Sequence, residues 1–278
     1  TTQVLVMSPT KELTIQTGAV FKAISQFMPG LRIQLAYGGS VFEEGSSFSS
    51  RNVPHIICGG FTREETENAL IDLQFLGIDN VLALRGDSIK TEPAFVPEPG
   101  GHAYAIDLVN QISQMNHGHY LHEDMQDVAP TNFCVGVAGY PEKHFEAPNM
   151  FSDIKQLKAK VQAGADYIVT QMFFDNTKYF EFVKSCRAIG INVPIIPGLK
   201  PIYTKKQLTI LPKTFHIDLP AALSEAVSAC KSDLDVEKIG EAWLLEQSRE
   251  LKKAGVPVLH YYTLGRPLLV ANVVKQLL

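Results

Sequence analysis

The chain has 278 residues, of which 45% are hydrophobic and 19% are charged. These values are typical of a globular protein with a large core, and α/β barrels of this size form one domain. A net charge of −4 gives no indication of a nucleic acid or an anionic membrane as partner. The four cysteines stand singly and no long apolar run occurs, so we expect a cytoplasmic protein with reduced thiols and no membrane span.

The N-terminal segment has the pattern strand, helix, strand. Residues 3–7 and 31–37 are apolar runs typical of strands, and residues 12–28 carry apolar side chains at helical spacing. This pattern predicts a βαβ unit with a right-handed crossover. Residues 41–52 are rich in serine and glycine, which indicates a loop or a poor helix.

Two motifs of this segment resemble the core of the DEAD-box RNA helicases. They are Val6-Met7-Ser8-Pro9-Thr10-Lys11-Glu12-Leu13 and Tyr37-Gly38-Gly39. In that family the corresponding segments touch the RNA backbone, although Lys11 stands where the family has arginine. The chain has neither a phosphate-binding Gly-x-x-x-x-Gly-Lys-Ser/Thr loop nor an Asp-Glu-Ala-Asp box. We therefore expect residues 1–50 to supply scaffold without nucleotide hydrolysis, and RNA binding is the less favoured alternative.

Beyond residue 53, strands and helices alternate to the end of the chain. The expected strands are residues 54–58, 80–84, 133–139, 167–171, 193–197 and 258–262. The expected helices are residues 62–75, 104–115, 152–163, 179–188, 205–211, 220–228 and 236–254, with one more at the end. Thr62 and Glu65 have the spacing of a capping box. With the two earlier strands, the pattern predicts a (βα)8 TIM-type barrel as one domain over residues 1–278.

The strand at residues 80–84 ends in a charged tip, Arg85-Gly86-Asp87. Such strand ends are where parallel α/β proteins keep their chemistry. An apolar strand that ends in Leu-Arg-Gly-Asp resembles the methylenetetrahydrofolate reductases, flavoenzymes built on a (βα)8 barrel. Without that resemblance, Arg85 and Asp87 could equally form a surface ion pair.

The reductase resemblance continues over residues 53–278, whereas residues 1–52 form the helicase-like βαβ segment. A reductase of this family ordinarily supplies its first two strands itself. We therefore interpret the chain as a chimera, designed so that a helicase-like fragment completes the barrel.

The resemblance implies an FAD site with NADH or NADPH as the reductant. Asp87 matches the family aspartate at the flavin's pyrimidine edge, where a carboxylate tunes the flavin potential and favours a cationic folate iminium. The cofactor-facing positions are His55, Arg85, Gly86, Asp87, Tyr104, Ala105, Ala138, Tyr140, His144, Asp153 and Lys160. Lys160 and His144 suit phosphate, and Asp153 suits sugar hydroxyls.

The residue pattern alone suggests other roles for three of these positions. Lys160 would be a solvated cation on a helix face, Asp153 a first-turn acid, and His55 a hydrogen-bonded core histidine. The three histidines within residues 116–130 form no metal-ligand pattern, so no metal site is predicted.

The resemblance also implies folate-binding positions. Gln171 matches the glutamine that hydrogen-bonds the folate pterin, and an amide suits that donor–acceptor edge. His260, Tyr262 and Arg266 correspond to substrate-facing positions at the last strand, so Asp87 and Gln171 are the catalytic candidates. Phe173 and Phe174 could stack on a planar ligand, but a strand-end aromatic pair is more often part of the core.

One catalytic group of the family is absent from the sequence. The glutamate that acts as general acid towards folate falls on Val6. A positioned general acid contributes about 10²–10⁴-fold, so we expect impaired folate turnover while reduction of the flavin survives. The predicted function is an FAD-binding oxidoreductase acting on folate and nicotinamide substrates, and the alternative is a designed barrel scaffold without activity. The sequence leaves homo-oligomerisation open.

Overall fold

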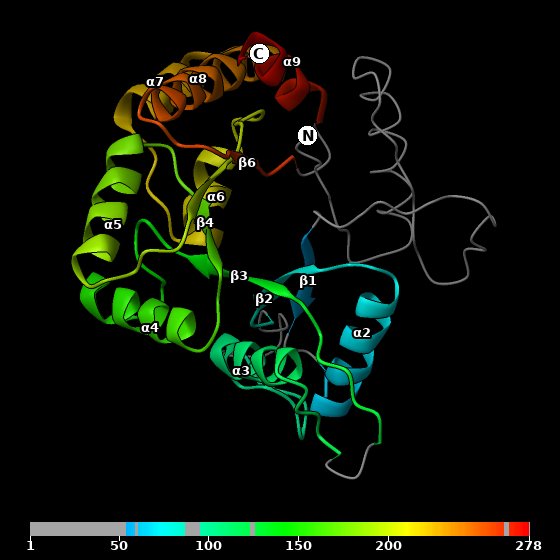
Figure 1. Ribbon diagram of the computed structural model, residues 1–278. Coiled ribbons are helices and arrows are strands. Elements are labelled where there is room, and N and C mark those ends of the chain that lie inside the picture. The colour runs from blue at the N-terminus through cyan, green and yellow to red at the C-terminus, as the bar shows by residue number, and fades with distance from the viewer. Residues whose placement is uncertain (1–53, 59–60, 87–94, 123–125, 264–266, 278) are drawn as a thin grey trace, which may run out of the picture. The chain divides into compact units, whose positions relative to one another are not determined.

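The structure is a computed structural model that describes residues 54–277 except 59–60, 87–94, 123–125 and 264–266 (Figure 1). The strands predicted at residues 3–7 and 31–37 and the helix between them lie outside this range, as do Val6 and the helicase-like motifs.

Strands and helices alternate along most of the described chain. The strands are β1 (Pro54–Cys58), β2 (Asn80–Leu84), β3 (Cys134–Gly139), β4 (Tyr167–Met172), β5 (Ile195–Leu199) and β6 (His260–Tyr261). The helices are α2 (Arg63–Phe75), α3 (Ala105–Asn116), α4 (Met150–Gln162), α5 (Asn176–Ala188), α6 (Gln207–Phe215), α7 (Ala221–Ala229), α8 (Asp233–Lys253) and α9 (Pro267–Leu277).

The strand order identifies the topology. The six strands follow one another in the sheet as they do in the sequence, β1-β2-β3-β4-β5-β6. The pairings of β1 with β2, β2 with β3 and β5 with β6 are parallel. A parallel sheet in chain order, with helices between its strands, is the topology of (βα) barrels, whereas doubly wound folds reverse their order at a switch point. The predicted α/β class is confirmed, and closure by two further strands within one domain stays a prediction.

The described residues fall into two compact units. Unit 1 contains residues 54–138 and Gln156–Ile168. Its core joins Leu70 of α2, Val81 of β2 and Ile112 of α3, all fully buried. The ring of Tyr167 fills the space over Gly136, where any Cβ would collide with it.

Unit 2 contains Gly139–Lys155 and residues 169–277, and it carries β5, β6 and helices α5–α9. Helix α8 packs against both α7 and α9, and the three lie together in Figure 1. A cluster of buried apolar side chains forms its core: Met172, Phe174, Ile202, Leu211, Ile217, Leu223, Val227, Cys230 and Val236. Gly240 allows α8 to approach closely, because a Cβ there would overlap the backbone of Ile202.

Two further expectations concern membrane spans and thiols. Within the described ranges, every helix is too short or too polar to cross a bilayer. Cys186 and Cys230 are buried free thiols, and Cys134 is a half-buried one.

Candidate active site

The carboxyl ends of β4, β5 and β6 gather polar side chains within unit 2. Tyr261 points to the helices, because its hydroxyl hydrogen-bonds Ser248 of α8 at 2.9 Å. Since side chains alternate along a strand, His260 and Tyr262 belong to the opposite face of the sheet. Gly198 of β5 makes room there, because a Cβ on it would meet the Tyr262 ring.

Tyr262 ties these strand ends together. Its backbone N–H donates to Leu199 O and its hydroxyl donates to Thr170 O, both at 2.8 Å. Its ring meets that of His260 edge-on, with the centroids 4.6 Å apart. Burial lowers the pKa of His260 and raises that of Tyr262. Near neutral pH this pair therefore presents two uncharged rings.

Gln171 supplies an oriented amide. Its Oε1 accepts a hydrogen bond from the backbone N–H of Met172 at 3.0 Å. Met172 packs in the cluster on the helix side, so Gln171, its neighbour in β4, belongs to the other face. The side chain is half-buried, and its NH₂ group donates to no other group in the described chain. The residue therefore keeps two donors for a ligand.

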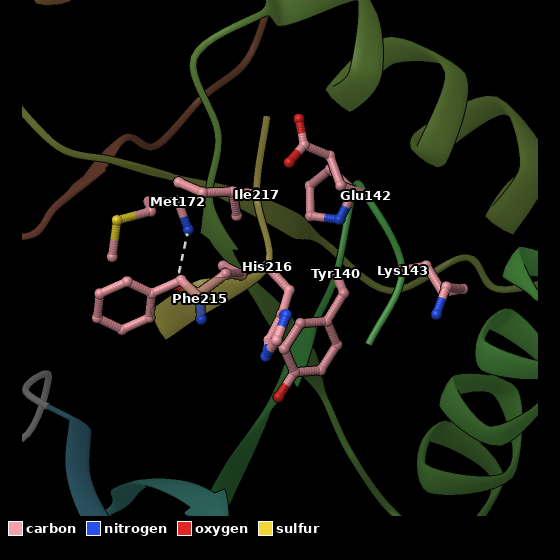
Figure 2. Close-up of a pocket in the computed structure, with 9 residues that line it drawn as sticks. Tyr140, Glu142, Lys143, Met172, Phe215, His216 and Ile217 are labelled. Carbon is pink, nitrogen blue, oxygen red and sulfur yellow. Dashed lines mark hydrogen bonds between the residues drawn. The ribbon is translucent and has the colours of Figure 1, made fainter. Parts of the chain in front are cut away.

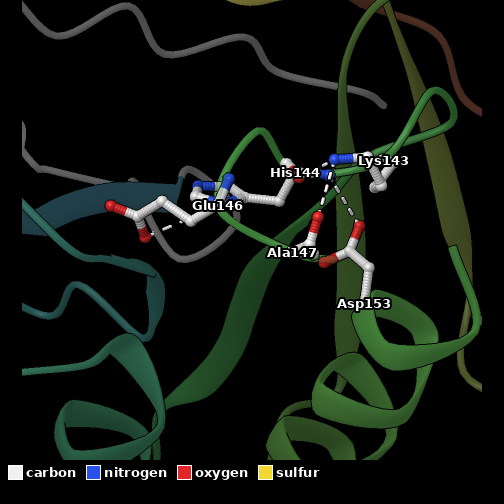
Figure 3. A network of polar contacts seen from close by, with 5 residues as sticks. All are labelled: Lys143, His144, Glu146, Ala147 and Asp153. Atoms are coloured by element: carbon white, nitrogen blue, oxygen red, sulfur yellow. Dashed lines mark hydrogen bonds and ion pairs between the residues drawn. The ribbon is translucent and has the colours of Figure 1, made fainter. Parts of the chain in front are cut away.

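The loop after β3 is held by a polar network (Figure 3). The Nζ of Lys143 donates to the carbonyl oxygens of His144 and Ala147, at 3.1 and 2.7 Å. The backbone N–H of His144 donates to Asp153 Oδ2 at 2.9 Å, and the His144 ring accepts from the N–H of Glu146 at 3.2 Å. Asp153 lies in the first turn of α4, so this bond fixes the loop to the start of the helix.

Aromatic rings extend from this loop to the end of α6. The ring centroids are 4.7 Å apart for Tyr140 and His144, and 4.8 Å apart for His144 and Phe145. Phe145 stacks on His216, the C-cap of α6, at 4.9 Å. His144 therefore belongs to a partly exposed row of rings in which it meets Tyr140 edge-on and Phe145 at a tilt.

A small pocket lies beneath these residues (Figure 2). Its volume is about 10 Å³, which is room for about one water molecule and not for a flavin or pterin. The lining residues are Tyr140, Pro141, Glu142, Lys143, Gln171, Met172, Phe215, His216 and Ile217. The carboxylate of Glu142 points away from Tyr140 (Figure 2), and its Oε2 accepts from the N–H of Asp218 at 2.7 Å.

Several predicted cofactor residues belong to unit 1. Lys160 is half-buried, and its Nζ donates to Ala138 O at 2.7 Å, so the pattern-based expectation of a solvated cation is wrong. Arg85 lies 5.6 Å from the centroid of the Phe95 ring. Ala105 is the first residue of α3, and Tyr104 precedes it as an exposed N-cap. Gly86 is the second residue after β2, and a Cβ on it would come within 2.7 Å of the Phe95 ring.

Three predicted residues cannot be assigned side-chain contacts. His55 lies within β1, and only its backbone is described. Asp87 and Arg266 lie outside the described residues.

Two residues of the site were assigned no role from the sequence, Lys200 and Glu142. Lys200 follows β5 directly and is only 1% exposed. A charged residue directly after an apolar run is the signal that could have found it. No group of three or more His, Cys, Asp or Glu side chains in the described ranges could hold a metal ion.

A parallel sheet in chain order with polar strand ends places the chain among the (βα)-barrel type of α/β proteins. The family model for methylenetetrahydrofolate reductase matches residues 46–278. The chain belongs to the methylenetetrahydrofolate reductase family. This confirms the resemblance predicted for residues 53–278, and the match begins slightly earlier.

Relatives from plants and bacteria agree with this assignment. Methylenetetrahydrofolate reductase (NADH) 1 of Arabidopsis thaliana is 38% identical, over 76% of this chain and 35% of its own length. The 5,10-methylenetetrahydrofolate reductase of Pectobacterium carotovorum is 32% identical, over 77% of this chain and 65% of its own length. This chain therefore spans about a third of the plant relative. Neither the family match nor these relatives support a helicase origin for residues 1–50 or a chimera.

One solved structure resembles this chain weakly. It is an uncharacterized Clostridium thermocellum protein that binds two copies of 5-methyl-5,6,7,8-tetrahydrofolic acid, 16% identical over 81% of this chain and 95% of that chain. Its TM-score of 0.40 is too low to support a functional conclusion.

Proposed function

We propose that this protein is a flavin-dependent oxidoreductase of the methylenetetrahydrofolate reductase type. The reaction transfers a hydride from NADH or NADPH, through FAD, to methylenetetrahydrofolate. The family match over residues 46–278 carries this proposal. The polar strand ends that contain Gln171 and Tyr262 support it, because substrates of parallel α/β enzymes bind at that edge.

Each unit, taken by itself, carries groups that suit a part of FAD. Pyrophosphate needs cations, and Lys160 and Arg85 lie near the ends of α4 and β2. The network around Asp153 uses one carboxylate oxygen, Oδ2, which leaves Oδ1 for a ribityl hydroxyl. When bound, FAD would supply the two-electron chemistry that passes a hydride from nicotinamide to folate.

The chain's own residues would orient the folate and limit charge at the reacting face. Gln171 would hydrogen-bond the pterin through the NH₂ group that the described chain leaves available. His260 and Tyr262 are uncharged near neutral pH, so they would line the site without stabilising stray anions. Asp87 would hold the flavin edge, as the family resemblance implies.

Folate turnover is the weaker half of the proposed activity. The family's general acid corresponds to Val6, and valine cannot deliver a proton. Loss of such a group lowers the rate by about 10²–10⁴-fold. Val6→Glu should therefore raise folate reduction and leave reduction of the flavin by a nicotinamide unchanged. An unchanged folate rate in a flavin-loaded variant would remove Val6 from this role.

The experiment that tests the function separates its two halves. The purified protein should absorb near about 450 nm as flavoproteins do, and NADH or NADPH should bleach that band under anaerobic conditions. Methylenetetrahydrofolate should then restore the band slowly. Failure to bind added FAD would contradict the proposal.

Gln171→Ala is the matched variant for the folate half. It should bind FAD and oxidise the nicotinamide normally but require a higher folate concentration, because it removes the pterin contact together with the local bond from the Met172 N–H. The proposal also includes a cytoplasmic protein that acts without nucleic acid or membrane, with its oligomeric state open.

A further inference from the structure

Lys200 is a buried cation without an acidic partner in the described part of the chain. It is 1% exposed, and its Nζ donates one hydrogen bond, to Pro201 O at 3.2 Å. The same nitrogen lies 4.6 Å from the centroid of the Tyr203 ring. An ammonium group has three donors, so these contacts leave hydrogen-bonding capacity unused.

This arrangement is unfavourable for stability. Burial lowers the pKa of Lys200 to about 8, which shows how strongly its surroundings disfavour the charge. A well-packed apolar side chain in such a place is usually as stable as a buried ion or more so. A role in binding would explain why the site carries lysine.

The position of Lys200 directly after β5 places its side chain on the face of the sheet that carries the candidate active site. The residue is two positions after Gly198, where a Cβ would collide with Thr170 O and the Tyr262 ring. Alternation along the strand gives Lys200 the same face as Gly198. Gln171 is the penultimate residue of the neighbouring strand β4 and lies on this face, and Gly198 is joined to β4 by its N–H bond to Thr170 Oγ1 at 2.9 Å.

We propose that Lys200 is a substrate-binding residue that donates hydrogen bonds to the 4-oxo oxygen of the folate pterin ring. The inference rests on the proposed function and adds a residue to its folate site. A lysine can only donate, so it recognises an acceptor, whereas the Gln171 amide can recognise a mixed edge. The charged tail of a folate needs water, and Lys200 is too deeply buried to meet it.

The pterin is a better match than the flavin for this position. The proposed flavin contacts come from β2, β3 and α4, whereas Lys200 follows β5, next to the strand that carries Gln171. To reach a ligand, the ammonium group gives up only the bond to Pro201 and the Tyr203 ring.

The test compares wild type with Lys200→Met in the FAD-loaded protein. We expect 5-methyltetrahydrofolate, measured by calorimetry, to bind at least about tenfold more weakly to the variant, since a hydrogen bond to a charged group is lost. The dissociation constant of FAD and the rate of flavin reduction by NADH should not change. Lys205→Met is the control, because Lys205 is exposed and donates only to Ser228 O.

The 4-amino analogue of tetrahydrofolate gives a second, more specific measurement. It presents a donor where folate has an acceptor, so wild type should bind it more weakly than the 4-oxo form. Lys200→Met should lose most of that preference. Lys200→Gln keeps a donor and should be intermediate, and it serves equally if the methionine variant does not fold.

Three outcomes overturn the inference. Equal folate affinity in wild type and Lys200→Met would make Lys200 a structural residue. A change in FAD affinity alone would mean that Lys200 contacts the cofactor and not the folate. Equal binding of the 4-oxo and 4-amino forms by wild type would exclude the contact with the 4-oxo oxygen. A wild-type protein that binds no FAD would instead contradict the proposed function, and the inference with it.

Discussion

At the scale of single residues, Glu142 is a described carboxylate whose pKa is moved close to neutral pH. Burial raises its pKa to about 7, and the N–H of Asp218 offsets this only in part. Oε1 is buried and has no hydrogen-bond partner. The other charges that act on the carboxylate are Asp218, Lys178 and Asp175. The folded protein therefore holds a proton on Glu142 more tightly than the unfolded chain does.

The sign of the resulting pH dependence follows from that difference. The contribution of Glu142 to stability is full below its unfolded pKa of 4.5 and is lost as pH rises through about 7. Glu142→Gln removes this loss, so the free energy of unfolding should fall less between pH 5 and pH 8. We expect the decrease in unfolding free energy between these pH values to be about 1 kcal/mol smaller in Glu142→Gln than in wild type, after solvent screening is considered. Urea unfolding at both pH values measures it.

The control for this prediction is Glu225→Gln, at an exposed position of α7. It should keep the wild-type pH dependence. If Glu142→Gln and Glu225→Gln respond to pH alike, Glu142 is ionised normally in the folded protein.

Tyr262→Phe tests the bond that joins β6 to β4. The change removes the hydroxyl that donates to Thr170 O but keeps the ring over Gly198. The free energy of unfolding should fall by about 1–2 kcal/mol, because a buried carbonyl loses its partner. Tyr120→Phe removes a hydroxyl bond of the same length, to Ala129 O at an exposed site, and should have less effect. If urea unfolding shows the same decrease in unfolding free energy for Tyr262→Phe and Tyr120→Phe, burial does not strengthen the Tyr262 bond.

Sequence reasoning located strand-end residues better than it located their partners. The apolar runs predicted where the strands end, and the family resemblance identified Gln171 and Tyr262 as ligand-facing residues at those ends. The bond from Asp218 to Glu142 joins residues 76 positions apart, and that from Lys160 to Ala138 joins residues 22 apart. Such contacts depend on the packing of whole elements, which local patterns do not specify.

At the scale of elements, local signals predicted boundaries well where capping decided them. The capping box of Thr62 and Glu65 is present, and α2 ends at Phe75 as predicted. Helix α5 begins at Asn176 rather than residue 179, because the Asp175 side chain accepts from the N–H of Thr177. Helix α8 begins at Asp233 rather than residue 236, since Ser232 caps it.

Boundaries set by tertiary contacts were predicted less well. Strand β5 covers Ile195–Leu199 rather than residues 193–197, because Gly198 and Leu199 pair with β6. Helix α6 continues past the predicted end at residue 211 and includes Pro212. In neither case does the local sequence mark the observed end.

The capping box gives a prediction about one element. Thr62→Ala removes the side chain that accepts from the N–H of Glu65 at 3.2 Å. We expect the free energy of unfolding to fall by about 1 kcal/mol, as for other N-cap losses. Urea unfolding followed by circular dichroism measures the change. Thr62→Ser keeps the acceptor and should stay close to wild type, and an equal loss in both variants would count against capping.

At the scale of the whole molecule, counting alternating elements was enough to predict an α/β protein with a parallel, barrel-type sheet. Each helix between two strands requires a crossover, and crossovers of one hand place successive strands side by side. The sheet order confirms this for all six described strands. Whether eight strands close into one domain depends on residues 3–37, which lie outside the described range, so the single-domain prediction is best tested by cooperativity.

We expect the two compact units to unfold in one transition. Their boundary cuts through β3, β4 and α4, so neither unit can unfold without breaking elements of the other. Trp243, the protein's one tryptophan, belongs to unit 2 and donates to Phe174 O at 3.0 Å. Thr62 belongs to unit 1.

Thr62→Ala should therefore shift the unfolding midpoint seen by Trp243 fluorescence as far as the one seen by circular dichroism. Coincident transitions are the signature of one cooperative domain. The slope of unfolding free energy against urea should stay at the wild-type value, because it scales with the surface exposed. A variant whose circular dichroism shifts while its tryptophan transition stays in place would show that the units unfold separately.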